Sequence, residues 1–395
     1  MLRRITIKNY KSIKNLSFDL GRINVFIGEN GSGKSNILES IAFGAAASKN
    51  KLDNEFLTNR GIRVTDPTFM RSAFTKSQTT KEIELIYECE DNKKATFHLT
   101  NDNQPYSVWK ELIYLSDSSQ SAEDKKKSTI ERNRFEALLK DMLNKSEKNL
   151  LIKKNIETIL QKLHENYSGS EICKNFENYL IFSPENSYLR NFQTEGQIEP
   201  LGRKGEGLFK LIKSFFQELD KKILNELTEL LKLFSWFEKF DIPADLFEGE
   251  NNISVFDKYI HFNSKTIDQR STSEGFLFLL FYFSLIISDK TPNFFAIENI
   301  ETALNPKLCT KVTKSITELA EKYNKQIVIT THNPAVLDGL NLDDPEQRLF
   351  VVYRNSDGYT VLNGYFKPHP IPGEEIVKLS ESFIRGYIGG LPKNF

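Results

Sequence analysis

The stretch Gly28-Glu29-Asn30-Gly31-Ser32-Gly33-Lys34-Ser35 decides the fold. It matches the pattern Gly-x-x-x-x-Gly-Lys-Ser/Thr, which binds phosphate when it joins a strand to a helix. The mostly apolar residues 24–27 before it predict a buried strand, and residues 36–47 after it carry apolar side chains at helical spacing. The sequence therefore predicts an α/β domain with a phosphate-binding loop. The alternative, a glycine-rich turn that arose by chance, does not explain this setting.

The residue types in this loop suit a nucleoside triphosphate. Glycines let backbone N–H groups converge on phosphate oxygens, and the N-terminus of the next helix attracts the same charge. Lys34 would reach the β- and γ-phosphates, and the Ser35 hydroxyl would ligate Mg²⁺. We therefore expect ATP and Mg²⁺ as ligands. The expected nucleotide-binding residues of the loop are Asn30, Gly31, Ser32, Gly33, Lys34, Ser35 and Asn36.

A second candidate residue ends the apolar stretch Asn293-Phe294-Phe295-Ala296-Ile297-Glu298. A phosphate-binding loop needs an acid nearby to hold Mg²⁺ directly or through water. The carboxyl ends of parallel strands line the ligand crevice of such sheets, so Glu298 is expected beside the loop as a metal ligand. Taken alone, it would be an ordinary exposed acid at the end of a strand.

Alternating strand and helix patterns predict a mostly parallel sheet with flanking helices, preceded by antiparallel strands. Residues 207–234 read as one long amphipathic helix. A polar, Lys/Glu-rich segment reads as a helical insertion, in which basic residues outnumber acidic ones by 10 to 6 between Ser121 and Lys154. Such a segment is either a solvated helical face or a contact for nucleic acid or a partner. The expected domains are an ATPase lobe (1–115), the insertion (116–178), a second ATPase lobe (179–366) and a tail (367–395).

Composition excludes several classes of protein. Lys+Arg and Asp+Glu are both 53, which argues against a uniformly basic nucleic-acid binder. Three dispersed cysteines exclude a disulfide scaffold and give no zinc pattern. The most apolar stretch, Gly275 to Ser288, is too short to cross a bilayer. The N-terminus lacks the apolar run of a signal peptide, so we expect a cytoplasmic protein without a membrane partner.

Several motifs together resemble the ABC-type ATPase heads of SMC, RecF and OLD proteins. They are the phosphate-binding loop, the preceding Asn9-Tyr10-Lys11-Ser12-Ile13, the late acidic strand, Ser271-Thr272-Ser273-Glu274-Gly275-Phe276 and Thr331-His332-Asn333-Pro334. Their order along the chain is that of the family, from residue 1 to about 355. The signature-like loop at 271–276 would be weak evidence alone, whereas the phosphate loop and the histidine motif are specific in combination.

This resemblance implies a head-to-tail homodimer or higher oligomer, with each ATP between one phosphate loop and the partner's signature loop. Ser273 and the backbone of Gly275 would contact the γ-phosphate across the interface, and His332 would contact it within its own chain. The plainer alternatives are a helix N-cap for Ser273 and a structural surface histidine for His332. Gln78 is a candidate for the coupling glutamine of ABC-type heads. Tyr10 or Lys11 either packs near the adenine or belongs to a tight turn.

Two departures from the family pattern bear on function. Asn299 occupies the position of the carboxylate that polarises the attacking water, and an amide cannot take a proton. Glu301 on the same turn is an alternative base, although its spacing differs from the family pattern. Glu298, Asn299 and His332 are therefore the expected catalytic group, with slow hydrolysis and ATP acting as a dimerising switch. In addition, the residues after 366 hold no acidic cluster of a nuclease domain.

Free-standing heads of this kind resemble the ATPase subunits of bacterial anti-phage modules, in which a second protein is the effector. The expected function is a sensor or regulator of such an effector, a nuclease. The alternative is a DNA-binding ATPase of the RecF or SMC type in DNA repair. A small-molecule kinase fits less well, because of the signature-like loop and Thr331-His332. A transporter subunit fits less well, because the helical insertion and the long tail do not suit it.

Overall fold

A computed structural model describes residues 1–91, 93–116, 138, 142, 171–192, 198–243, 251–261, 266–367 and 377–391. The expected helical insertion at 116–178 lies largely outside these residues. The chain forms two compact units, each built from separate stretches of sequence. The first unit comprises Met1–Leu20, Ser40–Thr58 and Ile62–Asn178, and the second comprises Gly21–Glu39, Asn59–Gly61 and Tyr179–Phe395.

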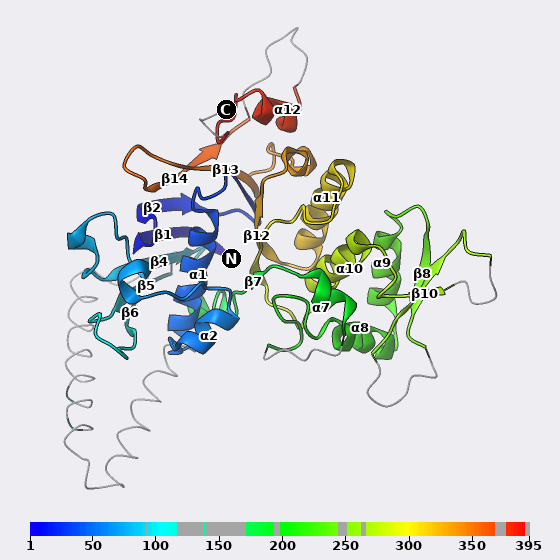
Figure 1. Ribbon diagram of the computed structural model, residues 1–395, viewed down its shortest axis with the longest axis horizontal. Helices are drawn as coiled ribbons and strands as arrows, with labels where there is room; N and C mark the ends of the chain where they lie inside the picture. Colours follow the sequence, from blue (N-terminus) through cyan, green and yellow to red (C-terminus); the bar gives the residue numbers. More distant parts are fainter. Residues whose placement is uncertain are drawn as a thin grey trace. The chain divides into compact units, whose positions relative to one another are not determined.

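The second unit is organised by a six-stranded sheet with the order β14-β13-β3-β12-β11-β7 (Figure 1). Its neighbouring strands run parallel except for β14, which pairs antiparallel with β13. This confirms the predicted mostly parallel sheet. The strands are β3 (Ile23–Ile27), β7 (Ile181–Phe182), β11 (Phe294–Ile297), β12 (Gln326–Thr331), β13 (Gln347–Arg354) and β14 (Thr360–Tyr365).

Buried apolar residues explain the centre of this sheet. Every residue of β3, β11 and β12 is buried, as expected for parallel strands covered on both faces. Helix α10 (Glu274–Ile287) is apolar all round and buried from Gly275 onward, which confirms the predicted buried helix. Helix α11 (Pro306–Lys322) is amphipathic and begins at the N-cap Asn305, whose side chain accepts from Leu308 N–H.

The expected single helix over 207–234 is wrong. The structure has two helices, α8 (Leu208–Gln217) and α9 (Lys222–Leu231). The chain leaves the helix at Glu218, and Lys221 adopts φ 48°, a left-handed conformation that no α-helix continues. Leu219 between them is fully exposed, so the regular apolar spacing of the sequence hid the break.

Smaller elements complete the second unit. A three-stranded antiparallel sheet has the order β10-β9-β8, formed by β8 (Phe237–Asp241), β9 (Ser254–Asp257) and β10 (Thr266–Asp268). In Figure 1 this sheet lies beyond α8 and α9. The short helices are α7 (Asn186–Arg190) and the 3-10 helix η2 (Pro334–Gly339).

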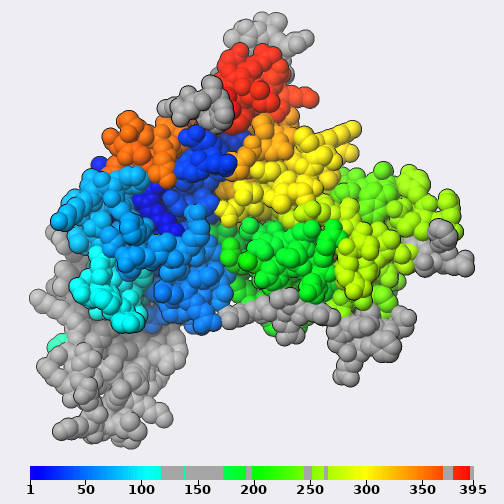
Figure 2. Space-filling model, viewed as in Figure 1, coloured from blue at the N-terminus to red at the C-terminus, as the bar shows by residue number. Residues whose placement is uncertain are grey.

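The end of the described chain packs on the same unit. Helix α12 (Leu379–Ile384) contacts η2, and Ser380 donates from its N–H and its hydroxyl to the Asp338 carboxylate at 2.9 and 2.7 Å. Ile388 is buried, and a Cβ on Gly390 would lie 2.7 Å from Val351 Cγ1 and 3.6 Å from Gly28 Cα. Figure 2 shows this segment in red at the surface. Among the described helices, none combines the length and apolar character needed to span a membrane.

The first unit is organised by a five-stranded antiparallel sheet with the order β2-β1-β4-β5-β6. Its strands are β1 (Leu2–Tyr10), β2 (Ile13–Asp19), β4 (Ile83–Cys89), β5 (Lys94–Thr100) and β6 (Lys110–Ser116). This confirms the predicted antiparallel N-terminal strands. This part of the chain also holds the short helices α2 (Asn54–Asn59), α3 (Pro67–Met70), η1 (Lys76–Gln78) and α6 (Glu171–Lys174), and α6 contacts β5.

The residues between β1 and β2 form a tight turn, one of the two readings of this segment. Tyr10 pairs with Ile13, and Lys11 at the corner has φ 45°. The Tyr10 side chain is completely buried, with its ring centroid 6.0 Å from that of Phe43. Gln78 ends η1, and its carbonyl accepts from Asn9 Nδ2 at 3.0 Å. The glutamine role expected for Gln78 stays a prediction.

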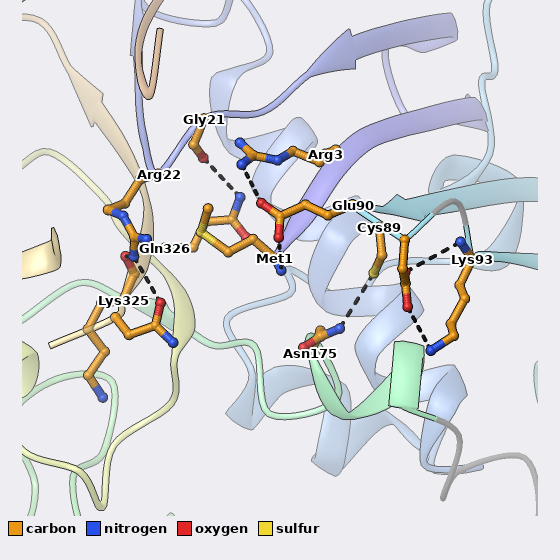
Figure 3. A network of polar contacts seen from close by, with 12 residues as sticks. Met1, Arg3, Gly21, Arg22, Cys89, Glu90, Lys93, Asn175, Lys325 and Gln326 are labelled. Carbon is orange, nitrogen blue, oxygen red and sulfur yellow. Dashed lines mark hydrogen bonds and ion pairs between the residues drawn. The ribbon is translucent and has the colours of Figure 1, made fainter. Parts of the chain in front are cut away.

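Polar contacts fix strand ends in each unit, and Figure 3 draws them. In the first unit, Glu90 pairs with Arg3 and with the Met1 amino group, and Asn175 Nδ2 donates to Cys89 Sγ at 3.5 Å. In the second, Gln326 Nε2 donates to the Gly21 carbonyl at 2.9 Å. This bond joins the starts of β3 and β12, two strands that lie far apart in the sequence.

Candidate functional site

Four parallel strands of the second unit carry the candidate residues at their carboxyl ends. The phosphate loop follows β3, Glu298 follows β11, His332 follows β12, and Arg354 ends β13. Because β13, β3, β12 and β11 are neighbours, these positions meet at one edge of the sheet. The strand order thus assembles a single site from four separate parts of the sequence.

The phosphate loop needs glycine for two reasons. A Cβ on Gly28 would lie 2.0 Å from the Val352 carbonyl oxygen, so β13 approaches too closely for any side chain. Gly31 and Gly33 have φ values of 77° and 107°, which other residues rarely adopt. Helix α1 (Lys34–Ser48) begins directly after Gly33, whose carbonyl accepts from Ile37 N–H at 3.1 Å. The loop therefore presents backbone N–H groups at a helix N-terminus, the arrangement that binds phosphate.

Lys34 is buried inside this loop. Its Nζ donates to the carbonyls of Gly28 and Glu29 at 2.7 and 2.9 Å. Burial lowers the pKa of Lys34 to about 8, against the opposing charges of Glu301, Glu298 and Glu29. A phosphate group would accept hydrogen bonds from this buried ammonium in place of the two carbonyls.

Ser35 and Glu298 form a pair fitted to a metal ion. The Ser35 hydroxyl donates to Glu298 Oε1, although 263 residues separate them in the sequence. A hydroxyl and a carboxylate oxygen are the ligands that Mg²⁺ prefers beside a phosphate loop. In addition, the Ser32 hydroxyl is buried without a hydrogen-bond partner among the described residues, as a group that awaits a phosphate oxygen would be. The donor set therefore fits Mg²⁺ and phosphate.

Asn299 lies on the sharp turn after β11. Its φ is 51°, a left-handed conformation that asparagine tolerates better than most residues. Its N–H donates to Thr330 Oγ1 at 3.0 Å, and its carbonyl accepts from Thr302 N–H at 3.0 Å. The turn is therefore fixed to β12, and the Asn299 amide follows directly after Glu298.

His332 and Glu301 are linked through the backbone. The N–H of His332 donates to Glu301 Oε1 at 2.7 Å. Burial and the charge of Lys34 lower the pKa of His332, and the carboxylate of Glu301 opposes this shift. The ring is thus held neutral near the phosphate loop. Glu301 belongs to the site, a position that its sequence spacing did not indicate.

The signature-like loop leads into α10 as an N-cap. Ser273 Oγ accepts from Phe276 N–H at 3.4 Å, so the N-cap reading of Ser273 is confirmed, which leaves the expected phosphate contact open. A Cβ on Gly275 would lie 3.0 Å from the Ala303 carbonyl oxygen, so this helix start packs directly on the turn after Glu301. Arg190 Nη1 donates to the carbonyls of Gln269, Arg270 and Thr272 and holds the loop in place.

Three residues of this region were missed by sequence reasoning. Arg354 Nε donates to the Gly31 carbonyl at 2.8 Å, and Thr360 Oγ1 donates to the Ser32 carbonyl at 3.0 Å. Arg203 is a half-buried cation whose Nε donates to the Ile181 carbonyl at 3.1 Å, and Glu298 is the foremost acid acting on it. None belongs to a motif, and only the hairpin pattern around Asn355–Gly358 hinted that Arg354 and Thr360 face each other.

Comparison with known proteins assigns the family. The model of the AAA ATPase domain matches residues 1–337. The chain belongs to this family. It is accordingly a nucleotide-binding ATPase, as the phosphate loop predicted. No curated protein matches the AAA ATPase chain.

Solved structures show the same fold. An SMC head bound to the C-winged helix domain of ScpA is 14% identical, with a TM-score of 0.54 over 92% of this chain and 98% of that chain. The SMC head with an extended coiled coil, bound to the C-terminal domain of ScpA derived from Pyrococcus furiosus, is 12% identical, with a TM-score of 0.50 over 92% and 96%. The AAA ATPase thus has the fold of an SMC head, which confirms the predicted fold class.

Proposed function

We propose that the AAA ATPase binds ATP·Mg²⁺ at the edge formed by β3, β11, β12 and β13 and dimerises head-to-tail around it. The contact between Ser35 and Glu298 carries this proposal, because it joins the end of the phosphate loop to the acid after β11. The ion, when bound, would neutralise charge on the β- and γ-phosphates. In the dimer, Ser273 and the Gly275 backbone of one chain would contact the γ-phosphate held by the other.

The chain's own residues would each have a separate task. The loop from Asn30 to Asn36 would bind phosphate oxygens with its N–H groups, and Lys34 would turn from the Gly28 and Glu29 carbonyls to the phosphates. Ser35 and Glu298 would hold the ion. His332, neutral because of its burial and the Lys34 charge, would donate a hydrogen bond to the γ-phosphate.

We also propose that hydrolysis is slow, so that ATP acts mainly as an assembly switch. Asn299 can orient a water through its amide but cannot accept the proton that leaves it. A general base commonly contributes about 10²–10⁴-fold to such a step. Its absence at position 299 would keep the dimer closed for longer after each binding event.

The switch would control a separate effector protein, a nuclease of a bacterial anti-phage module. The support is indirect. Heads of this class resemble the ATPase subunits of such modules, and one similar SMC head was solved bound to the C-winged helix domain of ScpA. The alternative is a RecF- or SMC-like DNA-binding ATPase in repair, which the mild basic excess of the segment around 121–154 favours.

Light-scattering mass with and without ATP·Mg²⁺, combined with steady-state phosphate release, tests this proposal. Wild type should assemble with ATP and release little phosphate, and Lys34→Ala should abolish the assembly. Glu298→Gln should weaken the magnesium dependence of ATP binding. Lys232→Ala is the control, because Lys232 pairs with Glu229 on the exposed surface of α9.

Other outcomes would redirect the proposal. Assembly that is complete without nucleotide would refute the proposed ATP-dependent dimerisation. Rapid phosphate release by wild type would refute the proposal that Asn299 makes hydrolysis slow. Salt-sensitive binding to duplex DNA that accelerates hydrolysis would favour the repair ATPase. ATP-dependent co-purification with a nuclease encoded beside the ATPase would favour the effector module.

A further inference from the structure

Residues 379–391, called the C-terminal segment below, return to the phosphate loop. Gly390 lies over the point where β3 passes into the loop, since a Cβ on it would be 3.6 Å from Gly28 Cα and 2.7 Å from Val351 Cγ1. Val351 on β13 pairs with Ile27, the last residue of β3. The backbone of Gly390 therefore lies against the first glycine of the loop, and a side chain at position 390 would not fit without displacement.

Gly28 is also enclosed by other parts of the second unit. A Cβ at this position would lie 2.0 Å from the Val352 carbonyl oxygen of β13. The Gly28 carbonyl accepts from Lys34 Nζ at 2.7 Å. The start of the phosphate loop thus lies between β13, the lysine of the loop and the C-terminal segment.

Helix α12 anchors the C-terminal segment on the second unit. Ser380 donates from its N–H and its hydroxyl to the Asp338 carboxylate at 2.9 and 2.7 Å. Asp338 belongs to η2, which begins two residues after His332. Phe383 and Ile388 are buried in the hydrophobic core that contains β3 and β13. The C-terminal segment is therefore packed on both elements that flank the nucleotide site here.

Glycines direct the chain from α12 to the phosphate loop. Gly386 has φ 80°, and the N–H groups of Gly386 and Tyr387 donate to helix carbonyls at 2.9 Å, a common way for a helix to end at glycine. Gly389 and Gly390 have φ values of 84° and 80°. Other residues rarely adopt these conformations, so the path of the chain to the loop depends on glycine.

We propose that the C-terminal segment is a positioning element of the ATP site, which holds the phosphate loop through Gly390. This inference rests on the proposed function, because it concerns how the loop is kept ready for ATP·Mg²⁺. A loop that is already held in its phosphate-binding conformation loses less conformational freedom when the ligand arrives. Because such coupling is reciprocal, bound ATP should in turn hold the C-terminal segment more firmly.

Gly390→Ala tests this role, because its Cβ would meet Val351 Cγ1 at 2.7 Å and displace the C-terminal segment from the loop. Gly389→Ala is the matched control. Position 389 has a similar left-handed φ, but the nearest atom to a Cβ there is 4.0 Å away. Both variants are made in the full chain. Calorimetry measures equilibrium binding of ATP·Mg²⁺, and the melting temperature of each variant is measured beside it.

Gly390→Ala should bind ATP·Mg²⁺ about three- to tenfold more weakly than Gly389→Ala. Equal ATP affinities in the two variants, with only a lower melting temperature in Gly390→Ala, would show a merely structural segment and overturn the proposal. Tighter binding by Gly390→Ala would also overturn it, because the C-terminal segment would then inhibit the site.

A second pair of variants acts on the anchor of the segment. Asp338→Ala removes the acceptor of both Ser380 bonds, whereas Asp343→Ala breaks a surface ion pair with Lys367. Asp338→Ala should weaken ATP binding, and Asp343→Ala should match wild type. This pair decides the question if Gly390→Ala does not fold. Equal ATP affinities in Asp338→Ala and Asp343→Ala would contradict the proposal.

Hydrogen exchange gives a readout that needs no nucleotide. The Ser32 and Ile37 amides, which donate to carbonyls of the phosphate loop, should exchange faster in Gly390→Ala than in Gly389→Ala. Equal exchange in the two variants would overturn the proposal. In wild type, ATP·Mg²⁺ should slow exchange at the Tyr387 amide, and faster exchange would overturn the coupling. Wild type that fails to bind ATP would instead overturn the proposed function, and the comparison without nucleotide would still decide whether the segment holds the loop.

Discussion

Position 299 is under a backbone constraint as well as a chemical one. The left-handed φ of 51° suits asparagine better than glutamate, so asparagine in place of glutamate has a structural benefit of its own here. Sequence comparison with a family pattern shows only the chemical loss. The two effects can be separated by residues that share size and backbone preference but differ in their ability to take a proton.

Asn299→Glu should raise single-turnover hydrolysis by about tenfold or more, because the new carboxylate can accept a proton from water. It should lower the free energy of unfolding by ~1 kcal/mol, since glutamate tolerates the left-handed conformation less well. Asn299→Gln is the control and should show the stability loss without the gain in rate. Equal rates for the two variants would show that position 299 does not limit hydrolysis.

Lys325 permits a pH prediction away from the site. Its Nζ donates to the Thr291 and Pro292 carbonyls at 3.0 and 3.3 Å, and burial lowers its pKa to about 8. Between that pH and the ordinary lysine pKa of 10.5, the unfolded chain binds more protons than the folded one. The contribution of Lys325 to the free energy of unfolding should therefore rise with pH through this window. Denaturant titrations should show a smaller rise in Lys325→Met, at lower stability throughout, whereas an unchanged slope would contradict the assignment.

Among the secondary-structure elements, the β13–β14 hairpin supports the phosphate loop, although its residues belong to no recognised motif. Arg354 and Thr360, near the two ends of the hairpin turn, donate to the Gly31 and Ser32 carbonyls. These bonds fix the Gly31 and Ser32 carbonyl oxygens toward the hairpin and so hold the backbone of the loop in place. The hairpin thus positions the loop that binds the nucleotide.

Thr360→Val, which keeps the shape of the side chain, should weaken ATP affinity by about fivefold, the value of one hydrogen bond. The measurement is equilibrium binding of ATP·Mg²⁺ by calorimetry. Thr317→Val is a suitable comparison, because the Thr317 hydroxyl donates to the Lys314 carbonyl within α11. Equal affinities in Thr360→Val and wild type would show that the loop keeps its shape without the hairpin.

Arg190 has the corresponding role for the signature-like loop. It donates to three carbonyls there, so Arg190→Gln should loosen the loop before α10. In light scattering, the ATP concentration needed for assembly should rise several-fold, while ATP binding by the single chain stays the same. Arg4→Gln, which breaks an exposed ion pair with Asp19, should leave assembly unchanged. If Arg190→Gln also weakened ATP binding by the single chain, this role of Arg190 would be contradicted.

For the whole molecule, sequence reasoning succeeded where a signal is local. The phosphate loop, the acidic end of β11 and the histidine after β12 each follow an apolar strand, and the parallel order of strands was enough to bring them to one edge. The break at Lys221 and the roles of Arg203 and Arg354 could not be foreseen in this way. A left-handed residue leaves the apolar spacing intact, and a lone arginine does not reveal its partners, as Arg354 shows with a partner 323 residues away.

The order of strands in the six-stranded sheet has a consequence for synthesis. Its central strand β3 is complete by residue 27, but its neighbours β12 and β13 begin only at residues 326 and 347. At a synthesis rate of ~5–20 residues per second, roughly 15–60 s pass between the synthesis of β3 and that of the strands that pair with it. During that time the apolar Ile23–Ile27 segment is a ready substrate for chaperones. The strands of the antiparallel sheet, which end by residue 116, emerge long before. The nucleotide site can therefore form only after β12 and β13 have been synthesised, so a chain that ends before residue 326 would lack it.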